Sequence, residues 1–291
     1  IAVGIADKTG VGVALSTAAV VSGAMFGDNL SIISDTTIAA TRTQGCEMRD
    51  KFKTNFKIVM PAAILTIIIL IMMTKNAGMV EIDTLEYSFI KIVPYLAVII
   101  AALCGLNVMI ILTAGIVIAG IIGLASGSFN IVGLCTSIAS GAMGMSELII
   151  ISLMIAGTIA IIKENGGIDF ILNIGLKKFK NKRDAELGIA ALVSFVDICT
   201  ANNTIAIVST GPIAKDISDE FELEPKRVAG ILDMFSCVFQ GIIPHGAQLI
   251  SAAGIALVSP FEIMKFLFYP YLMGICALIS IFYYNRKRAA R

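Results

Sequence analysis

Charged side chains are scarce in this sequence, and histidine is nearly absent. Only 15% of the 291 residues are charged, whereas 57% are hydrophobic; a typical soluble domain carries about 25% charged residues. The single histidine and the six cysteines, which form no Cys-x-x-Cys pair, argue against a zinc site. A formal net charge of +1 gives no electrostatic reason to expect a nucleic-acid partner. The composition therefore predicts an integral membrane protein.

Long apolar stretches predict the helices that cross the bilayer. A hydrocarbon core about 30 Å thick is spanned by about 20 apolar residues in a helix. The predicted fold is an all-α, polytopic helix bundle in the lipid bilayer of the cell membrane. The predicted spans are Ile58–Met73, Ile92–Cys104, Asn107–Ala125, Leu148–Ile162, Leu187–Ala214 with a polar interruption, and Glu262–Tyr284.

The segments between these stretches alternate in charge. Five cations stand against two anions in 42–57, two against three in 75–91, six against four in 163–186 and three against five in 215–227. The tail after Tyr284 adds four cations. Because basic segments stay on the cytoplasmic side, this alternation predicts a cytoplasmic C-terminus. It also predicts that Leu187–Ala214 crosses the membrane once, as a single broken helix.

Three polar regions, Gly23–Thr37, Asp197–Thr204 and Asp233–Gln248, interrupt the apolar pattern. Each contains at least one carboxylate. A carboxylate at membrane depth is costly, so we expect each to have a partner or a function. Unwound backbone is tolerated there only where protein or a water-filled cavity satisfies it, and broken transporter helices use such backbone to coordinate ions. The candidate binding residues are Asp28, Asn29, Ser31, Ser34, Asp35, Thr36, Thr37, Asp197, Thr200, Asn202, Asn203, Thr204, Asp233, Gln240 and His245.

Simpler interpretations of these residues stay open at this point. The first region could be a polar loop in which Ser34-Asp35-Thr36-Thr37 caps a helix. His245 could be a hydrogen-bonded structural residue and not a proton carrier. Glu262 could mark the first turn of a helix, where the helix dipole favours a negative charge.

The first and third regions are followed by similar layouts. Gly27-Asp28 leads to a basic connector and a helix with Pro61, whereas Gln240-Gly241 leads to the Ser259-Pro260 connector and a helix with Pro270. The two connectors fall on opposite sides, which predicts an inverted-topology repeat. The predicted parts are the remainder of a first repeat (1–74), connecting transmembrane helices (75–166) and a second repeat (167–291). Since nothing before the first region matches the broken helix of the second repeat, we expect further N-terminal helices in the natural protein.

Gly27-Asp28-Asn29-Leu30-Ser31 followed by Ser34-Asp35-Thr36-Thr37 is similar to the F-G-D-K-x-S-P-x-S-D-T-T signature of the NhaC-type sodium/proton antiporter family, within the ion-transporter superfamily. Further similarity lies in Pro212–Asp216 with Leu223-Glu-Pro225, and in Asp233 with Gly241 and Pro244. Ala201-Asn202-Asn203 stands where many members have Gly-Asp-Gln, so one intramembrane carboxylate is missing. The stretch Ser236–Gln248 resembles the amino-acid-transporting branch. The resemblance implies ion-coupled transport.

The predicted function is secondary active exchange of Na⁺ for H⁺. A carboxylate that binds either ion, but never both, exchanges them by competition. Na⁺ is expected at Asp28, Asp35, Asn202 and Asn203, with hydroxyl groups of the neighbouring Ser and Thr residues as further ligands. Neither enzymatic activity nor a resident cofactor is expected.

Three other functions remain open. The first is Na⁺- or H⁺-coupled transport of an amino acid or small carboxylate, with the organic solute as an additional partner. The second is a passive channel. The third is an intramembrane aspartyl protease, although no Tyr-Asp or Gly-x-Gly-Asp flanks a candidate aspartate. Assembly as a homodimer is also left open.

Overall fold

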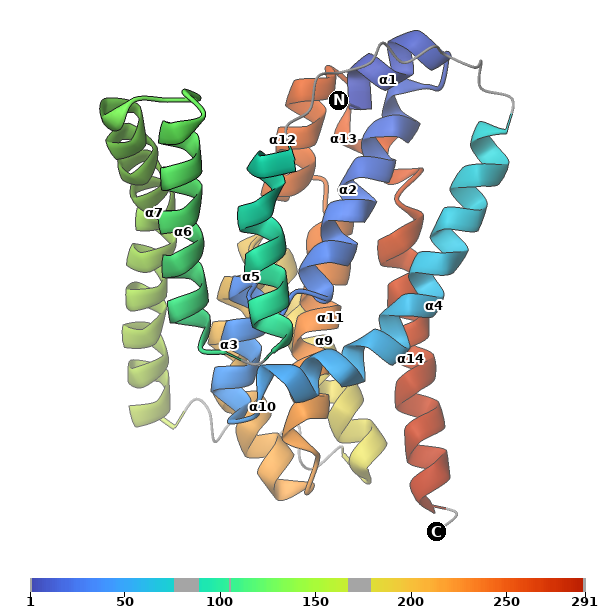
Figure 1. The fold of residues 1–291 in the computed structure, drawn as a ribbon. Coiled ribbons are helices and arrows are strands. Elements are labelled where there is room, and N and C mark those ends of the chain that lie inside the picture. Colours follow the sequence, from blue (N-terminus) through green and yellow to red (C-terminus); the bar gives the residue numbers. More distant parts are fainter. Residues whose placement is uncertain (1, 76–88, 105, 167–178, 290–291) are drawn as a thin grey trace. The chain divides into compact units, whose positions relative to one another are not determined.

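The computed structural model describes residues 2–75, 89–104, 106–166 and 179–289 (Figure 1). All regular structure in these residues is helical, which confirms the predicted all-α class. Contacts divide the chain into two units, residues 1–80 with 156–291 and residues 81–155. Each unit is described by itself.

The first half of the larger unit is an interrupted helix followed by a long one. After α1 (Ala2–Thr9), α2 (Val13–Asn29) stops at a short gap and α3 (Asp35–Gln44) begins beyond it. Gly45 ends α3 with a φ of 70°, a left-handed conformation that glycine adopts at little cost. The chain then turns into α4 (Met48–Thr74), which contains Pro61.

The second half repeats this order. Helix α11 (Pro225–Ile242) stops at a gap, and α12 (Ala247–Ala256) follows and ends at Leu257, which is also left-handed. The short helix α13 (Pro260–Met264) leads into α14 (Phe268–Ala289), which contains Pro270. Ser259 and Glu262 form a capping box at the start of α13, so Glu262 has the structural role that the simpler interpretation gave it.

The two halves run in opposite directions, as the predicted inverted repeat requires. Ala18 near the start of α2 packs with Leu249 and Ala253 of α12. Further along, Met25 of α2 lies against Gly241 at the end of α11, and α3 packs on α11 itself. The α2–α3 segment therefore runs antiparallel to the α11–α12 segment. The gap after α2 lies beside the body of α11, because Asp28 at the end of α2 contacts Cys237 within α11.

The prediction that Leu187–Ala214 crosses the membrane once is wrong. Helices α9 (Lys182–Thr200) and α10 (Asn203–Glu220) form a hairpin. The open ends meet, because Lys182 Nζ donates to the Glu222 carbonyl at 3.1 Å and the rings of Phe179 and Phe221 lie 6.0 Å apart. The reversal occurs at Ala201, which has a φ of 51°. Charge counting missed it because the rule assumes that every apolar stretch crosses.

Several loop charges also belong to the interior of the unit. Arg227 at the start of α11 makes a two-pronged ion pair with Glu186 of α9, and both side chains are buried. Tyr284 near the end of α14 donates to Glu224, which precedes α11, at 2.5 Å. The acidic segment 215–227 therefore lies at the same end of the unit as the start of α9 and the end of α14. Its predicted placement on the opposite side is wrong.

An exposed apolar face of the kind that contacts lipid is clearest on α4. By length and composition, Met48–Thr74 is the one helix in the described residues that could cross a membrane unaided, and four shorter apolar helices accompany it. Ile64, Ile67, Ile68 and Ile71 of α4 are exposed. The opposite stripe is buried, as expected for a helix between lipid and a protein core. It consists of Lys51, Asn55, Val59, Ala62, Ala63 and Thr66.

The smaller unit contains a 3-10 turn (Phe89–Ile92), α5 (Val93–Leu103), α6 (Val108–Ala125) and the larger part of α7 (Ile131–Glu164). Helices α5 and α6 pack together and match two predicted spans, and the predicted span Leu148–Ile162 lies within α7. Most of the connecting segment 75–91, whose charges entered the prediction of topology, lies outside the described residues. The three-part division into 1–74, 75–166 and 167–291 stays a prediction.

The hairpin gives the first testable prediction. In a background without the native cysteines, Lys182→Cys paired with Glu222→Cys should be joined by a short bis-maleimide, because these side chains lie 3.5 Å apart. The control pair Lys182→Cys with Lys265→Cys, at opposite ends of the unit, should not be joined. Cross-linking is read as a mobility shift after cleavage between the two sites. An unlinked first pair would contradict the hairpin.

Candidate functional site

The first polar region lies at the gap between α2 and α3, where Ser34 replaces missing helical hydrogen bonds. The Ser34 hydroxyl accepts from the Thr37 backbone N–H and caps α3. The same hydroxyl donates to the backbone carbonyl of Asp28 at 3.3 Å. One set of residues thus both caps a helix and joins the two parts of an interrupted one.

Asp28 receives polar contacts from two other helices. The Thr36 hydroxyl of α3 lies 3.5 Å from each carboxylate oxygen, and the Cys237 thiol of α11 lies 3.3 Å from Oδ2. The carboxylate also interacts electrostatically with those of Asp35 and Asp233. Asp28 is half-buried. The inverted halves therefore bring their carboxylates to one place.

The tip of the α9–α10 hairpin reaches the same place. The Thr204 hydroxyl donates to Asp35 Oδ2 at 2.6 Å, and Asn203 Nδ2 lies 3.6 Å from Cys237 Sγ. Asn202 caps α10, because its side-chain oxygen accepts from the backbone N–H three residues further on, at 3.0 Å. The first and second predicted regions are thus in direct contact.

A buried ion pair completes the cluster. Lys51 Nζ of α4 lies 2.7 Å from Asp233 Oδ2 of α11, and both side chains have no exposed surface. Lys51 also donates to the Thr37 hydroxyl at 2.6 Å, and Asn55 Nδ2 donates to Asp233 Oδ2 at 2.9 Å. Such a pair is costly to desolvate and is retained only with good geometry and further hydrogen bonds. Here α3, α4 and α11 supply them.

The cluster carries more negative than positive charge. Asp28 interacts with two further carboxylates, those of Asp35 and Asp233, and with one ammonium group, that of Lys51. Lys51 is directly paired with Asp233. Asp28 and Asp35 have hydroxyl and thiol partners instead, and neither is paired with a cation in the described part of the chain. A surplus of carboxylates at membrane depth of this kind is costly unless a cation or a proton offsets it.

Lys51, Asn55 and Cys237 are site residues that the sequence prediction missed. The charge count of 42–57 places Lys51 among the loop charges, and Cys237 was considered only as one of the six cysteines that argue against a zinc site. A usable signal does exist, because Lys51 and Asn55 continue the buried stripe of α4 at intervals of four residues towards its N-terminus. Tracing that stripe backwards from Val59 identifies both.

Asp197 and Gln240 lie together but outside these contacts. Both side chains are buried, and the Gln240 backbone faces the Asp197 carboxylate. In the described residues no hydrogen bond of ordinary geometry reaches either Asp197 oxygen or the Gln240 side-chain oxygen. They form a second polar contact between α9 and α11.

The remaining predicted residues have local roles. His245 is exposed, and its Nε2 lies 3.0 Å from the Ile198 carbonyl, as in the structural interpretation. Thr200 is exposed and bonds to its own helix. Asn29 donates to the Met25 carbonyl, and the Ser31 hydroxyl accepts from a backbone N–H two residues on. The structure shows no contact from these four to the carboxylates.

No group of three or more His, Cys, Asp or Glu side chains suited to a metal occurs in the described residues. The ligands that the cluster offers are carboxylate and hydroxyl oxygens. These are hard ligands and suit a cation such as Na⁺ better than a transition metal.

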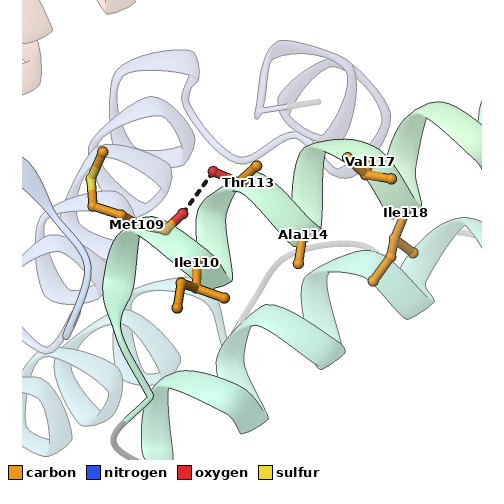
Figure 2. Close-up of a pocket in the computed structure, with 6 residues that line it drawn as sticks. All are labelled: Met109, Ile110, Thr113, Ala114, Val117 and Ile118. Atoms are coloured by element: carbon orange, nitrogen blue, oxygen red, sulfur yellow. Dashed lines mark hydrogen bonds between the residues drawn. The ribbon is translucent and has the colours of Figure 1, made fainter.

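A pocket in the smaller unit lacks such chemistry. Figure 2 shows it along α6, lined by apolar side chains and one hydroxyl. That hydroxyl, of Thr113, donates to the Met109 carbonyl of its own helix at 2.7 Å. The face suits apolar contact and offers no ion ligand.

Comparison with known proteins shows the family of this chain. Residues 72–285 match the model of the Na⁺/H⁺ antiporter family. The chain is similar to a malate-2H⁺/Na⁺-lactate antiporter of Bacillus subtilis, with 22% identity covering 91% of this chain and 63% of that protein. It is also similar to the Na⁺/H⁺ antiporter NhaC of Alkalihalophilus pseudofirmus, with 23% identity covering 91% and 64%.

A second NhaC antiporter, from Bacillus subtilis, is 21% identical over 95% of this chain and 68% of its own length. The chain thus spans 63–68% of the length of these three relatives. The family match covers most of the chain and bears out the sequence resemblance. The chain belongs to the Na⁺/H⁺ antiporter family, a family of membrane transporters and not of enzymes.

Proposed function

We propose that this protein exchanges Na⁺ for H⁺ across the cell membrane by letting the two ions compete for Asp28 and Asp35. The observation that carries the proposal is the charge balance of the cluster. Lys51 Nζ forms an ion pair with Asp233 at 2.7 Å, whereas Asp28 and Asp35 accept hydrogen bonds only from neutral donors. Asp28 is half-buried, and Asp35 is exposed but accepts a hydrogen bond from Thr204. A carboxylate partly shielded from water favours a bound cation or a proton, and occupancy by one excludes the other.

The proposed Na⁺ ligands come from both the helix gap and the hairpin tip. Asp28 and Asp35 supply charge, and the hydroxyl groups of Thr36 and Thr204 already lie within 3.5 Å of them. Asn202 and Asn203 complete the set proposed from the sequence. Since their side-chain oxygens also accept backbone hydrogen bonds, their part is to hold the tip in place as well as to present oxygen.

The inverted halves provide a route to alternating access. Ions bound where two oppositely directed interrupted helices meet can be exposed to either side by rocking one part against another. We further propose that the end carrying Lys53, Lys226 and the basic tail faces the cytoplasm, because basic residues gather there. The C-terminus is then cytoplasmic.

A second candidate is exchange involving an organic carboxylate. It is favoured by one specific observation, that a relative covering 91% of this chain bears the name malate-2H⁺/Na⁺-lactate antiporter. In that case Na⁺ and H⁺ would use the same cluster, and the organic anion would bind near it.

Flux measurements on the full-length protein in liposomes test both candidates. An inward Na⁺ gradient should drive H⁺ outward with no organic solute present, and Asp28→Asn or Asp35→Asn should abolish this flux without loss of membrane insertion. The physical reason is that an amide cannot exchange a proton for Na⁺. Flux is read from a pH-sensitive dye inside the liposomes.

The matched control is Asp216→Asn, an exposed aspartate of α10 that is expected to leave flux unchanged. If H⁺ moves only when malate or lactate is added, the organic-carboxylate candidate replaces the first one. If both Asp28→Asn and Asp35→Asn exchange normally, the cluster is not the site.

The buried ion pair gives a prediction about stability. Lys51→Met leaves the Asp233 carboxylate buried without its cation, and breaking a buried pair in this way costs roughly 3–5 kcal/mol. Lys51→Met combined with Asp233→Leu removes both charges and should restore most of the loss. Thermal unfolding in detergent measures the change.

Lys53→Met is the control, because Lys53 is exposed one half-turn away on the same helix. It should leave the unfolding temperature nearly unchanged. A Lys51→Met protein as stable as the Lys53→Met protein would show that the pair does not hold the cluster together.

A further inference from the structure

An open pocket of about 560 Å³ lies where α4, α11 and α14 meet, at the end of the larger unit that carries the C-terminus. It is separate from the carboxylate cluster, and none of its lining residues takes part in the proposed exchange. The lining residues are Asp50, Lys53, Thr54, Lys57, Ile58, Glu224, Lys226, Arg227, Ser280 and Tyr284.

The pocket has a surplus of positive charge. Two of its four cations are engaged, Arg227 with Glu186 and Lys226 with Glu224 at 3.5 Å. The other two, Lys53 and Lys57, are exposed and have no ion-pair partner in the part of the chain that the structure describes. They stand four residues apart, on one face of α4. Asp50, one turn before Lys53, also lines the pocket, so these two ammonium groups exceed the remaining carboxylate by one positive charge.

The sequence places this pocket at the membrane boundary from two directions. In α4, Lys57 is the last charged residue before the uninterrupted apolar stretch that starts at Ile58. In α14, Tyr283 and Tyr284 end the apolar stretch, and a basic tail follows. Tyrosines and lysines at the ends of a span mark the headgroup level of a bilayer. Both boundaries fall in the same pocket, because Lys57, Ile58 and Tyr284 all line it.

We propose that this pocket binds the phosphate-bearing headgroup of an anionic phospholipid. Lys53 and Lys57 hold the phosphate by charge, the Thr54 and Ser280 hydroxyls lie beside it, and Ile58 begins the apolar surface along which an acyl chain runs. Basic pockets between transmembrane helices on the cytoplasmic side bind anionic headgroups for these reasons. A free phosphate ion would make the same polar contacts but would make no contact with the apolar surface that begins at Ile58.

Native mass spectrometry of the purified protein in detergent tests the proposal. Phosphatidylglycerol should stay bound where phosphatidylcholine does not, and Lys53→Gln with Lys57→Gln should weaken phosphatidylglycerol binding at least about tenfold. Lys75→Gln, an exposed lysine at the other end of α4, is the control and should bind as the unmodified protein does. Lys53→Arg with Lys57→Arg keeps both charges and should retain binding.

Three results would overturn the proposal. The double Gln variant could bind phosphatidylglycerol as tightly as the Lys75→Gln control. Phosphatidylcholine could bind equally well, which would mean that charge is not recognised. Millimolar inorganic phosphate could displace the bound lipid completely, which would assign the pocket to a free anion.

Discussion

The buried ion pair between Lys51 and Asp233 is the interaction on which this structure depends. A bilayer offers no water to a charge or an unpaired backbone group, so interrupted helices persist only where protein satisfies them. The pair, with Thr37 and Asn55 as further partners, fixes α3, α4 and α11 against one another. It also pairs the lysine, so that the nearby carboxylates of Asp28 and Asp35 have no paired cation in the described part of the chain.

Local chemistry made much of the fold predictable. Ser34 caps the start of α3, and Gly45 ends that helix in a left-handed conformation. Ser259 and Glu262 form a capping box at the start of α13. Each signal depends on neighbours in the sequence, so no long-range contact is needed to interpret it. The inverted repeat was predicted from the similar layouts that follow the first and third polar regions. The Asp28–Thr37 region was predicted from its polar residues within an apolar sequence.

The parts that could not be predicted depend on contacts distant in sequence. A lysine in a charged stretch gives no sign by itself that it is buried, and Lys51 is buried only because Asp233, 182 positions away, faces it. The hairpin was missed because it turns at Ala201 in a left-handed conformation, and alanine rarely adopts a positive φ. Conversely, His245 and Thr200 have suitable chemistry but lie at exposed positions without a link to the carboxylates.

Proton release on Na⁺ binding tests the central claim most directly. If Na⁺ and H⁺ compete for the same carboxylates, adding Na⁺ to the full-length protein in weakly buffered detergent solution near neutral pH should release protons. The release should saturate with Na⁺ binding followed by calorimetry, and K⁺ at equal ionic strength is the control. Saturable Na⁺ binding that releases no protons across the pH range of transport would contradict the account.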